Sequence, residues 1–281
     1  MKIGISSFVW VSPFSTENID ILYKAKDFGY DLLEVAVEDA SLIDLKKLKQ
    51  VAREVGLDLT VSGAFGTDRD ISSDQAEYRK IGLSYIKDCI RIANELESPV
   101  FGGPLYSAVG KTRLVSAEQK AIERQYCLEN LYEATKYAAE MGIVLGLEPL
   151  NRFETDMINT VDQALALINE IDHPHLKILL DTFHSNIEEK DVIKSIHLLG
   201  DKLVHVQGNE NDRGTPGTGQ VNWIGIRDAL NDIGYQGSIV LETFGSPSKE
   251  LARAASIWRP LAESADILAS EGATFFTKIF K

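Results

Sequence analysis

The chain has 281 residues, a hydrophobic fraction of 44% and a charged fraction of 25%, which are the proportions of an ordinary soluble globular protein. Its formal net charge of -13 repels phosphate backbones and anionic lipid, and the absence of a basic patch argues against nucleic-acid or membrane partners. No apolar run approaches the ~20 residues of a membrane span, and the first residues look like a core strand, so we expect a cytoplasmic protein.

Short β-branched runs alternate with longer segments of helical periodicity along the whole chain. The expected strands occupy residues 2–8, 32–37, 59–64, 99–103, 144–150, 177–182, 203–209 and 238–244. Helical patterns lie between them, and the clearest cover residues 42–56, 77–97 and 116–142. Eight strands, each followed by a helix, predict an α/β fold of the (β/α)8 TIM-barrel type. With no linker or composition shift, we expect a single domain over residues 1–281.

The chain closes with a long helical region over about residues 249–281. Its late apolar cluster exceeds what one barrel helix needs. The cluster consists of Phe275, Phe276, Ile279 and Phe280. We expect it to pack under the barrel or against another subunit, and we expect a homo-oligomer, either a dimer or a tetramer.

Polar residues end the last four expected strands, and in TIM barrels these strand ends form the active-site mouth. They are Glu148, Asp181, Gln207 and Glu242. Three carboxylates and an amide that converge there are costly to bury without positive charge. A divalent cation would supply that charge. Structural ion pairs with Arg152, Arg213 or Lys177 are the alternative.

The ligand types constrain the metal. Carboxylate and amide oxygens suit Mg²⁺ and Mn²⁺ better than zinc, so we expect Mn²⁺, with Mg²⁺ or Co²⁺ as alternatives. Glu148 and Glu242 are three strands apart on an eight-stranded ring and would flank a molecule bound between them. Such a pair suits removal of a proton from one face and its return on the other. The metal would polarise a carbonyl and hold the resulting enediolate.

Four segments resemble the ketose 3-epimerases, the group that includes D-tagatose, D-allulose (psicose) and L-ribulose 3-epimerases among the xylose-isomerase-like barrels. The segments are LEPLNRFETDMINT, LLDTFHSNIEE, ENDRGTPGTG and VLETF. The resemblance implies a metal-dependent isomerase that interconverts free ketoses at C3 through a cis-enediolate. It implies that Glu148 and Glu242 are both the acid/base pair and metal ligands, and that Asp181 is a third ligand.

The resemblance also implies the sugar contacts and shows one departure. Glu154, His184 and Arg213 match positions that hydrogen-bond the sugar around C1 to C3, with Arg213 on a loop beyond the metal ligands. The fourth ligand of the family is a histidine on the seventh strand, and its place here is Gln207. Either the Gln207 oxygen coordinates the metal, or the site has lost a ligand. His205 lies one layer deeper, too low to replace it, and is expected to be a core histidine.

Two rival functions stay open. The same enolisation chemistry would suit an epimerase or lyase that acts on 3-keto sugars or 3-keto-glycosides. A non-catalytic sugar-binding barrel is the alternative of another class, although binding alone does not need a base on both faces. Three aromatic residues at early strand ends are candidates for the apolar wall of the sugar pocket or for caps of the core. They are Phe8, Trp10 and Phe65.

Overall fold

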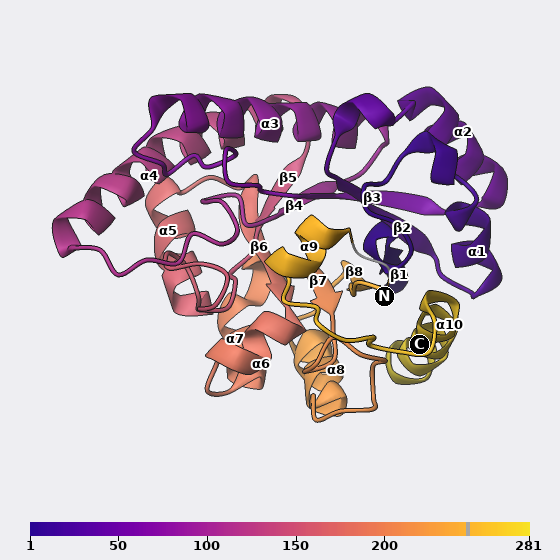
Figure 1. Cartoon of the computed structure of the whole chain (residues 1–281). Helices are drawn as coiled ribbons and strands as arrows, with labels where there is room; N and C mark the ends of the chain where they lie inside the picture. The colour runs from indigo at the N-terminus through magenta and orange to yellow at the C-terminus, as the bar shows by residue number, and fades with distance from the viewer. Residues whose placement is uncertain (246–247) are drawn as a thin grey trace.

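The computed structural model describes residues 1–245 and 248–281, and eight parallel strands form one closed barrel in the order β1 to β8 (Figure 1). The strands are β1 (Lys2–Ser6), β2 (Leu32–Val37), β3 (Asp58–Gly63), β4 (Val100–Gly103), β5 (Val144–Leu147), β6 (Leu176–Asp181), β7 (Leu203–Gly208) and β8 (Ser238–Leu241). Each strand overlaps one expected range. The expected single-domain TIM barrel is confirmed.

Every strand is followed by at least one helix on the outside of the barrel. The α-helices are α1 (Ile21–Asp27), α2 (Leu45–Val55), α3 (Ala76–Glu95), α4 (Ala117–Glu140), α5 (Val161–Ile171), α6 (Thr182–Glu188), α7 (Val192–Leu199), α8 (Trp223–Asp232), α9 (Lys249–Ala254) and α10 (Ala265–Phe280). Short 3-10 helices are η1 (Ser7–Val9), η2 (Thr16–Asn18), η3 (Ala40–Leu42) and η4 (Gly200–Lys202). No α-helix in the described ranges is long and apolar enough to cross a membrane.

The middle of the barrel is packed with side chains, as in other closed barrels of this size. Leu179 on β6 fills the space opposite two glycines. A Cβ added at Gly102 would lie 2.5 Å from the Leu179 Cδ1, and one at Gly146 would lie 3.3 Å from its Cβ. Small residues on β4 and β5 therefore accommodate a large one on β6.

Two strands end earlier than expected, and this decides where their site residues lie along the barrel axis. β5 ends at Leu147 and β8 at Leu241, so Glu148 and Glu242 are the first residues beyond their strands. The Glu148 N–H still donates to the carbonyl of Gly103 at 3.0 Å, which keeps it in the barrel wall. Asp181 is the last residue of β6 and also caps α6, because its Oδ1 accepts from the Phe183 N–H at 2.6 Å.

The C-terminal aromatic cluster packs within the chain. α10 lies beside α8 on the outside of the barrel, and the Trp223 ring is 5.8 Å from Phe275, 5.3 Å from Phe276 and 6.4 Å from Phe280 between centroids. Phe276 is completely buried. α10 thus takes the place of the eighth barrel helix, and the cluster packs on the outside of the barrel rather than under it. The alternative, a contact with another subunit, stays a prediction.

Candidate functional site

The barrel brings the four expected strand-end residues together at one end. Glu148, Asp181, Gln207 and Glu242 are each at most 8% exposed. Asp181 and Gln207 are directly paired in the register of β6 and β7. Glu148 and Glu242 both border one pocket of about 350 Å³, together with Glu154, His184 and Arg213. The predicted strand-end residues therefore do meet at one end of the barrel, and their roles stay a prediction.

The rest of that pocket is largely apolar. Its walls include Phe8, Phe65, Val109 and Phe244 on the barrel loops, and Leu251 and Ala254 on α9. Figure 1 shows α9 lying across the strands, in the position of a cover over the mouth. Two of the three expected wall aromatics are confirmed as pocket residues. Trp10 instead stacks on Phe28 and donates its indole N–H to Asp266 at 2.7 Å.

We use the name mouth cluster for four carboxylates: Glu148, Glu154 and Glu242, which line this pocket as Glu38 does, and Asp181, whose charge acts on Glu148. Burial raises the pKa of Glu148 well above its ordinary value, and the charges of Glu242 and Asp181 raise it further. Burial also raises the pKa of Glu242 to about 8, although the Arg213 charge lowers it. The pKa values of Asp181 and Glu154 are raised by burial as well. The cluster thus holds protons readily as long as no further cation is present.

Arg213 is the one Lys or Arg in the described part of the chain within 4.0 Å of a mouth-cluster carboxylate. Its guanidinium is 3.0 Å from Glu242 and 3.7 Å from Asp181, and it lies over the rings of Phe183 and Phe244 at 4.1 and 4.9 Å. Its backbone has a φ of 61°, a strained conformation for a residue with a side chain. Arg213 thus contacts two of the predicted metal ligands, and its predicted place just beyond them stays a prediction.

His184 joins the same group from α6. Ligand atoms of Glu148, Asp181 and His184 all lie within 4.8 Å of one another, so these three residues could hold a metal ion. The His184 Nδ1 accepts from the backbone N–H of Asn151 at 3.0 Å. Burial lowers the pKa of His184 well below its ordinary value, and the Arg213 charge lowers it further. The imidazole is therefore neutral near pH 7.

Gln207 has an asymmetric environment. Its amide nitrogen donates to Glu34 Oε1 at 2.8 Å and to Glu242 Oε1 at 3.0 Å. Its amide oxygen is buried and has no hydrogen-bond partner. An unpaired buried acceptor costs about 1–3 kcal/mol, so an oxygen in this state indicates a missing electrophilic partner.

Sequence reasoning missed two residues of this site. Glu34 on β2 is 1% exposed and pairs with His205 as well as with Gln207. Asn209, just past β7, donates from its side-chain amide to Asp181 Oδ2 at 2.9 Å. Glu34 lies inside the expected strand LLEVAV, where a lone acid among apolar residues was the available signal. His205 is 1% exposed and points inward, which confirms it as a core histidine.

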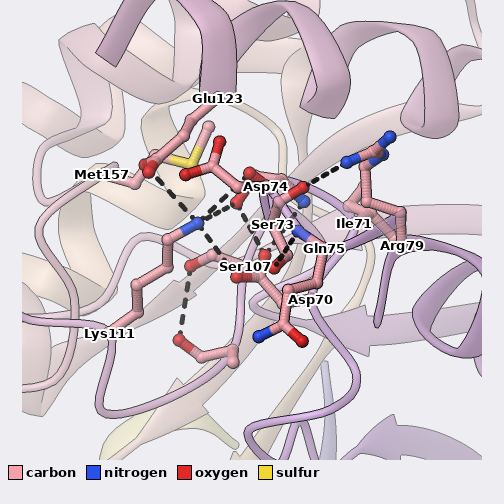
Figure 2. Close-up of polar contacts among 12 residues, drawn as sticks. Asp70, Ile71, Ser73, Asp74, Gln75, Arg79, Ser107, Lys111, Glu123 and Met157 are labelled. Atoms are coloured by element: carbon pink, nitrogen blue, oxygen red, sulfur yellow. Dashed lines mark hydrogen bonds and ion pairs between the residues drawn. The ribbon is translucent and has the colours of Figure 1, made fainter. Parts of the chain in front are cut away.

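A second group of charges joins the loops after β3, β4 and β5 to α4, and we call it the loop cluster: Asp70, Glu123 and Asp156 with Lys111 and Arg113. Figure 2 shows the Lys111 side chain reaching between Asp70, at 2.9 Å, and Glu123, at 3.5 Å. Arg113 binds both oxygens of Glu123, at 2.9 and 2.7 Å. Burial alone would raise the pKa of Glu123, but the hydrogen bonds from Arg113 and Gln119 outweigh it and lower that pKa to about 2.

A larger cavity of about 800 Å³ opens at the opposite end of the barrel. Its lining includes Lys2, Asp58, Lys177 and Ser238, at the start of their strands, and His205 reaches it from inside. None of the four strand-end residues borders it. Since chemistry in TIM barrels occurs at the C-terminal strand ends, the smaller pocket is the candidate active site.

The chain is similar to known proteins over most of its length. Residues 22–262 match the family described as the xylose isomerase-like TIM barrel. A D-psicose 3-epimerase of Ruminiclostridium cellulolyticum is 32% identical over 271 residues, which is 95% of this chain and 92% of that protein. A 3-dehydro-D-guloside 4-epimerase of Escherichia coli is 31% identical over 248 residues, covering 86% and 92% of the two chains.

The three-dimensional match is equally extensive. The crystal structure of a D-allulose 3-epimerase from Methylomonas sp. in complex with D-allulose superposes with a TM-score of 0.93 and 29% sequence identity, over 99% of this chain and 97% of that one. An L-ribulose 3-epimerase structure gives the same TM-score, with 30% identity and coverage of 99% and 94%. This chain therefore belongs to the xylose isomerase-like TIM barrels and, among them, to the ketose 3-epimerase family of isomerases.

Proposed function

We propose that this protein epimerises a free ketose at C3, with Glu148 and Glu242 as the acid/base pair. The observation that carries the proposal is the mouth cluster, because three of its carboxylates line one pocket with a single guanidinium, which also lies 3.7 Å from the fourth, Asp181. A pocket of about 350 Å³ is in the size range of small-molecule sites. The fold and the family support a sugar as the molecule that occupies it.

The proposed metal ligands are Glu148, Asp181, Gln207 and Glu242. The unpaired Gln207 oxygen supports this set, since a cation would give that oxygen the partner it lacks. All four residues offer oxygen, which favours Mn²⁺, or Mg²⁺ and Co²⁺ as alternatives, over zinc. When bound, the cation would polarise the ketose carbonyl and so ease removal of the neighbouring proton.

His184 is better assigned to the sugar than to the metal. Its Nδ1 accepts a hydrogen bond from the Asn151 N–H, and the Arg213 guanidinium, which can only donate, lies 3.3 Å from Nε2. His184 also lines the pocket. A cation bound at Nε2 would lie beside the positive charge of Arg213 and be repelled by it, whereas a sugar hydroxyl would not. Glu154 and Arg213 complete the proposed sugar contacts.

The proton chemistry follows from two carboxyl groups on opposite sides of the substrate. One ionised carboxylate removes the proton from C3, and the electron pair of the broken C–H bond becomes part of a cis-enediolate. The other group, in its protonated form, returns a proton to the opposite face of C3. In the metal-free protein burial raises the pKa values of both Glu148 and Glu242, and a bound cation would lower them again, which favours an ionised carboxylate in the loaded site.

The test is turnover in D₂O with a panel of free ketopentoses and ketohexoses, before and after removal of metal with a chelator. We expect one solvent deuterium at C3 of each product molecule, loss of activity on chelation and recovery with Mn²⁺. Product that forms without solvent deuterium would overturn the two-base mechanism. Full activity after complete metal removal would overturn the metal assignment.

A second candidate substrate class is the 3-keto sugars and 3-keto-glycosides. The observation that favours it is the 31% identity to a 3-dehydro-D-guloside 4-epimerase. The same mouth cluster would serve, with the proton removed from a different carbon. A specificity constant for a 3-keto-glycoside that exceeds those for all free ketoses would make this candidate the better one.

A further inference from the structure

We propose that Glu34, held by His205, is a positioning residue that orients the Gln207 amide so that strand β7 presents its oxygen to the metal. This inference rests on the proposed function, in which Gln207 is a ligand. It adds an explanation of how a glutamine can act as a metal ligand at the position where the family's pattern has a histidine.

An amide ligand has an orientation problem that an imidazole ligand lacks. The terminal torsion of glutamine is soft, and its two ends are close in size but opposite in polarity. One orientation turns a lone pair toward a cation, and the other turns two N–H groups toward it. The residue functions as a ligand only if its neighbours exclude the second orientation.

The contacts of Gln207 supply that selection. Its amide nitrogen is placed between two carboxylate oxygens, Glu34 Oε1 at 2.8 Å and Glu242 Oε1 at 3.0 Å. With the amide reversed, its oxygen would face both carboxylates and repel them. Glu242 is itself a proposed ligand, so its oxygens are shared with the cation. Glu34 is the neighbour whose bond to the amide does not compete with metal binding.

Glu34 is fixed by a second contact at a deeper level. Its other oxygen, Oε2, lies 2.7 Å from His205 Nε2, and His205 Nδ1 lies 3.3 Å from Ser238 Oγ. His205 and Gln207 are two residues apart on β7 and face the same way, so one carboxylate bridges two layers of the barrel. Glu34 and His205 are each 1% exposed. Because His205 holds Oε2, the other Glu34 oxygen, Oε1, keeps a defined position at which it accepts from the Gln207 amide.

The experiment measures Mn²⁺ binding to metal-free protein, by calorimetry or from the signal of free Mn²⁺ in electron paramagnetic resonance. Four variants are compared with the parent: Glu34→Gln, Glu34→Asp, Gln207→Ala and the double variant Glu34→Gln/Gln207→Ala. Loss of a hydrogen-bond partner behind a ligand typically weakens metal binding about 10–100-fold. We expect that loss for Glu34→Gln and also for Glu34→Asp, which keeps the charge but shortens the reach.

The double variant separates orientation from simple charge attraction. If Glu34 acts through Gln207, the double variant should bind Mn²⁺ within about twofold of Gln207→Ala alone, the usual scatter of uncoupled effects. An equal loss from Glu34→Gln in both backgrounds would overturn the proposal, as would parental affinity in Glu34→Asp. In either case Gln207 could remain a ligand. Parental affinity in Gln207→Ala would instead overturn the ligand assignment itself.

A structure of the Mn²⁺-bound parent protein tests the proposal without any substitution. We expect the Gln207 oxygen on the metal and its nitrogen within hydrogen-bonding distance of Glu34. A Gln207 oxygen on the metal with the nitrogen bonded elsewhere would contradict the role of Glu34 while leaving the ligand in place.

Discussion

The mouth cluster and the loop cluster are both buried groups of carboxylates, yet their charges are arranged in opposite ways. In the loop cluster every carboxylate has a cationic partner: Lys111 is 2.9 Å from Asp70, and Arg113 is 2.7 Å from Glu123 and 3.2 Å from Asp156. In the mouth cluster, Glu148 has no Lys or Arg partner among the described residues. Its nearest basic group is the neutral ring of His184.

The pKa values express this difference. The pKa of Glu123 is lowered to about 2, whereas that of Glu242 is raised to about 8, although both side chains are almost fully buried. Burial raises the pKa of both groups, and the hydrogen bonds from Arg113 and Gln119 outweigh it at Glu123, whereas the single charge of Arg213 does not outweigh burial and the neighbouring carboxylates at Glu242. A buried carboxylate with its partners in place is structural. A buried carboxylate that lacks one indicates a site that expects a ligand.

The largest contrast should come from the same substitution in each cluster. Glu148→Gln should lower turnover by about 10²–10⁴-fold, because it removes a proton-transfer group. The metal-free variant should melt at the parental temperature or higher, since one of several crowded carboxylates is gone. Glu123→Gln, the matched control, should instead melt at a lower temperature. A folded Glu148→Gln variant with parental turnover would show that Glu148 does not transfer a proton, and the contrast between the two clusters would then fail.

Lys111→Met tests the loop cluster from its cationic side. The substitution leaves Asp70 without its cationic partner. It also removes the positive charge between Asp70 and Glu123, so that these two carboxylates repel each other. Removing one partner of a buried ion pair typically costs about 3–5 kcal/mol, and we expect a loss of that size in the free energy of unfolding, measured with urea. Lys194→Met is the control, since that side chain is 83% exposed, and should change stability by less than about 0.5 kcal/mol. Equal effects at the two lysines would show that Lys111 is not structural.

The pH dependence of stability should separate the clusters further. The pKa of Glu123 is lowered in the folded protein from 4.5 to about 2, so its ionised form stabilises the fold. This contribution is complete above pH 4.5 and is lost as the pH falls toward about 2. The difference in unfolding free energy between the parent and Glu123→Gln should therefore be constant above that range and shrink within it. A difference that grows on acidification would contradict the sign of the shift.

Gln207→His gives the smallest expected effect and bears on the mouth cluster alone. Imidazole suits Zn²⁺, Co²⁺ and Ni²⁺ better than an amide oxygen does, so the ratio of Zn²⁺ to Mn²⁺ affinity should rise about tenfold. Competition titrations on metal-free protein measure this ratio. An unchanged ratio would indicate that residue 207 does not contact the metal.

Local patterns in the chain were enough to predict the barrel and to group the residues that meet at the carboxyl ends of its last four strands. Each strand was visible as a short β-branched run, and parallel strands in a closed ring place all their carboxyl ends together. Glu148, Asp181, Gln207 and Glu242 could therefore be grouped before any distance was known. The same pattern placed His205 below Gln207, because side chains two residues apart on a strand share a face.

Contacts between distant segments could not be read in this way. Glu34 and Gln207 are 173 residues apart and meet only because the ring closes, so no local spacing connects them. The contacts of Arg213 with Asp181 and Glu242 depend on how its loop folds back over the mouth, which sequence position alone does not specify. The loop cluster joins residues 70, 111, 123 and 156 from three loops and α4. The periods of strands and helices specify which face a residue occupies, whereas its partner across the barrel depends on the packing of the whole chain.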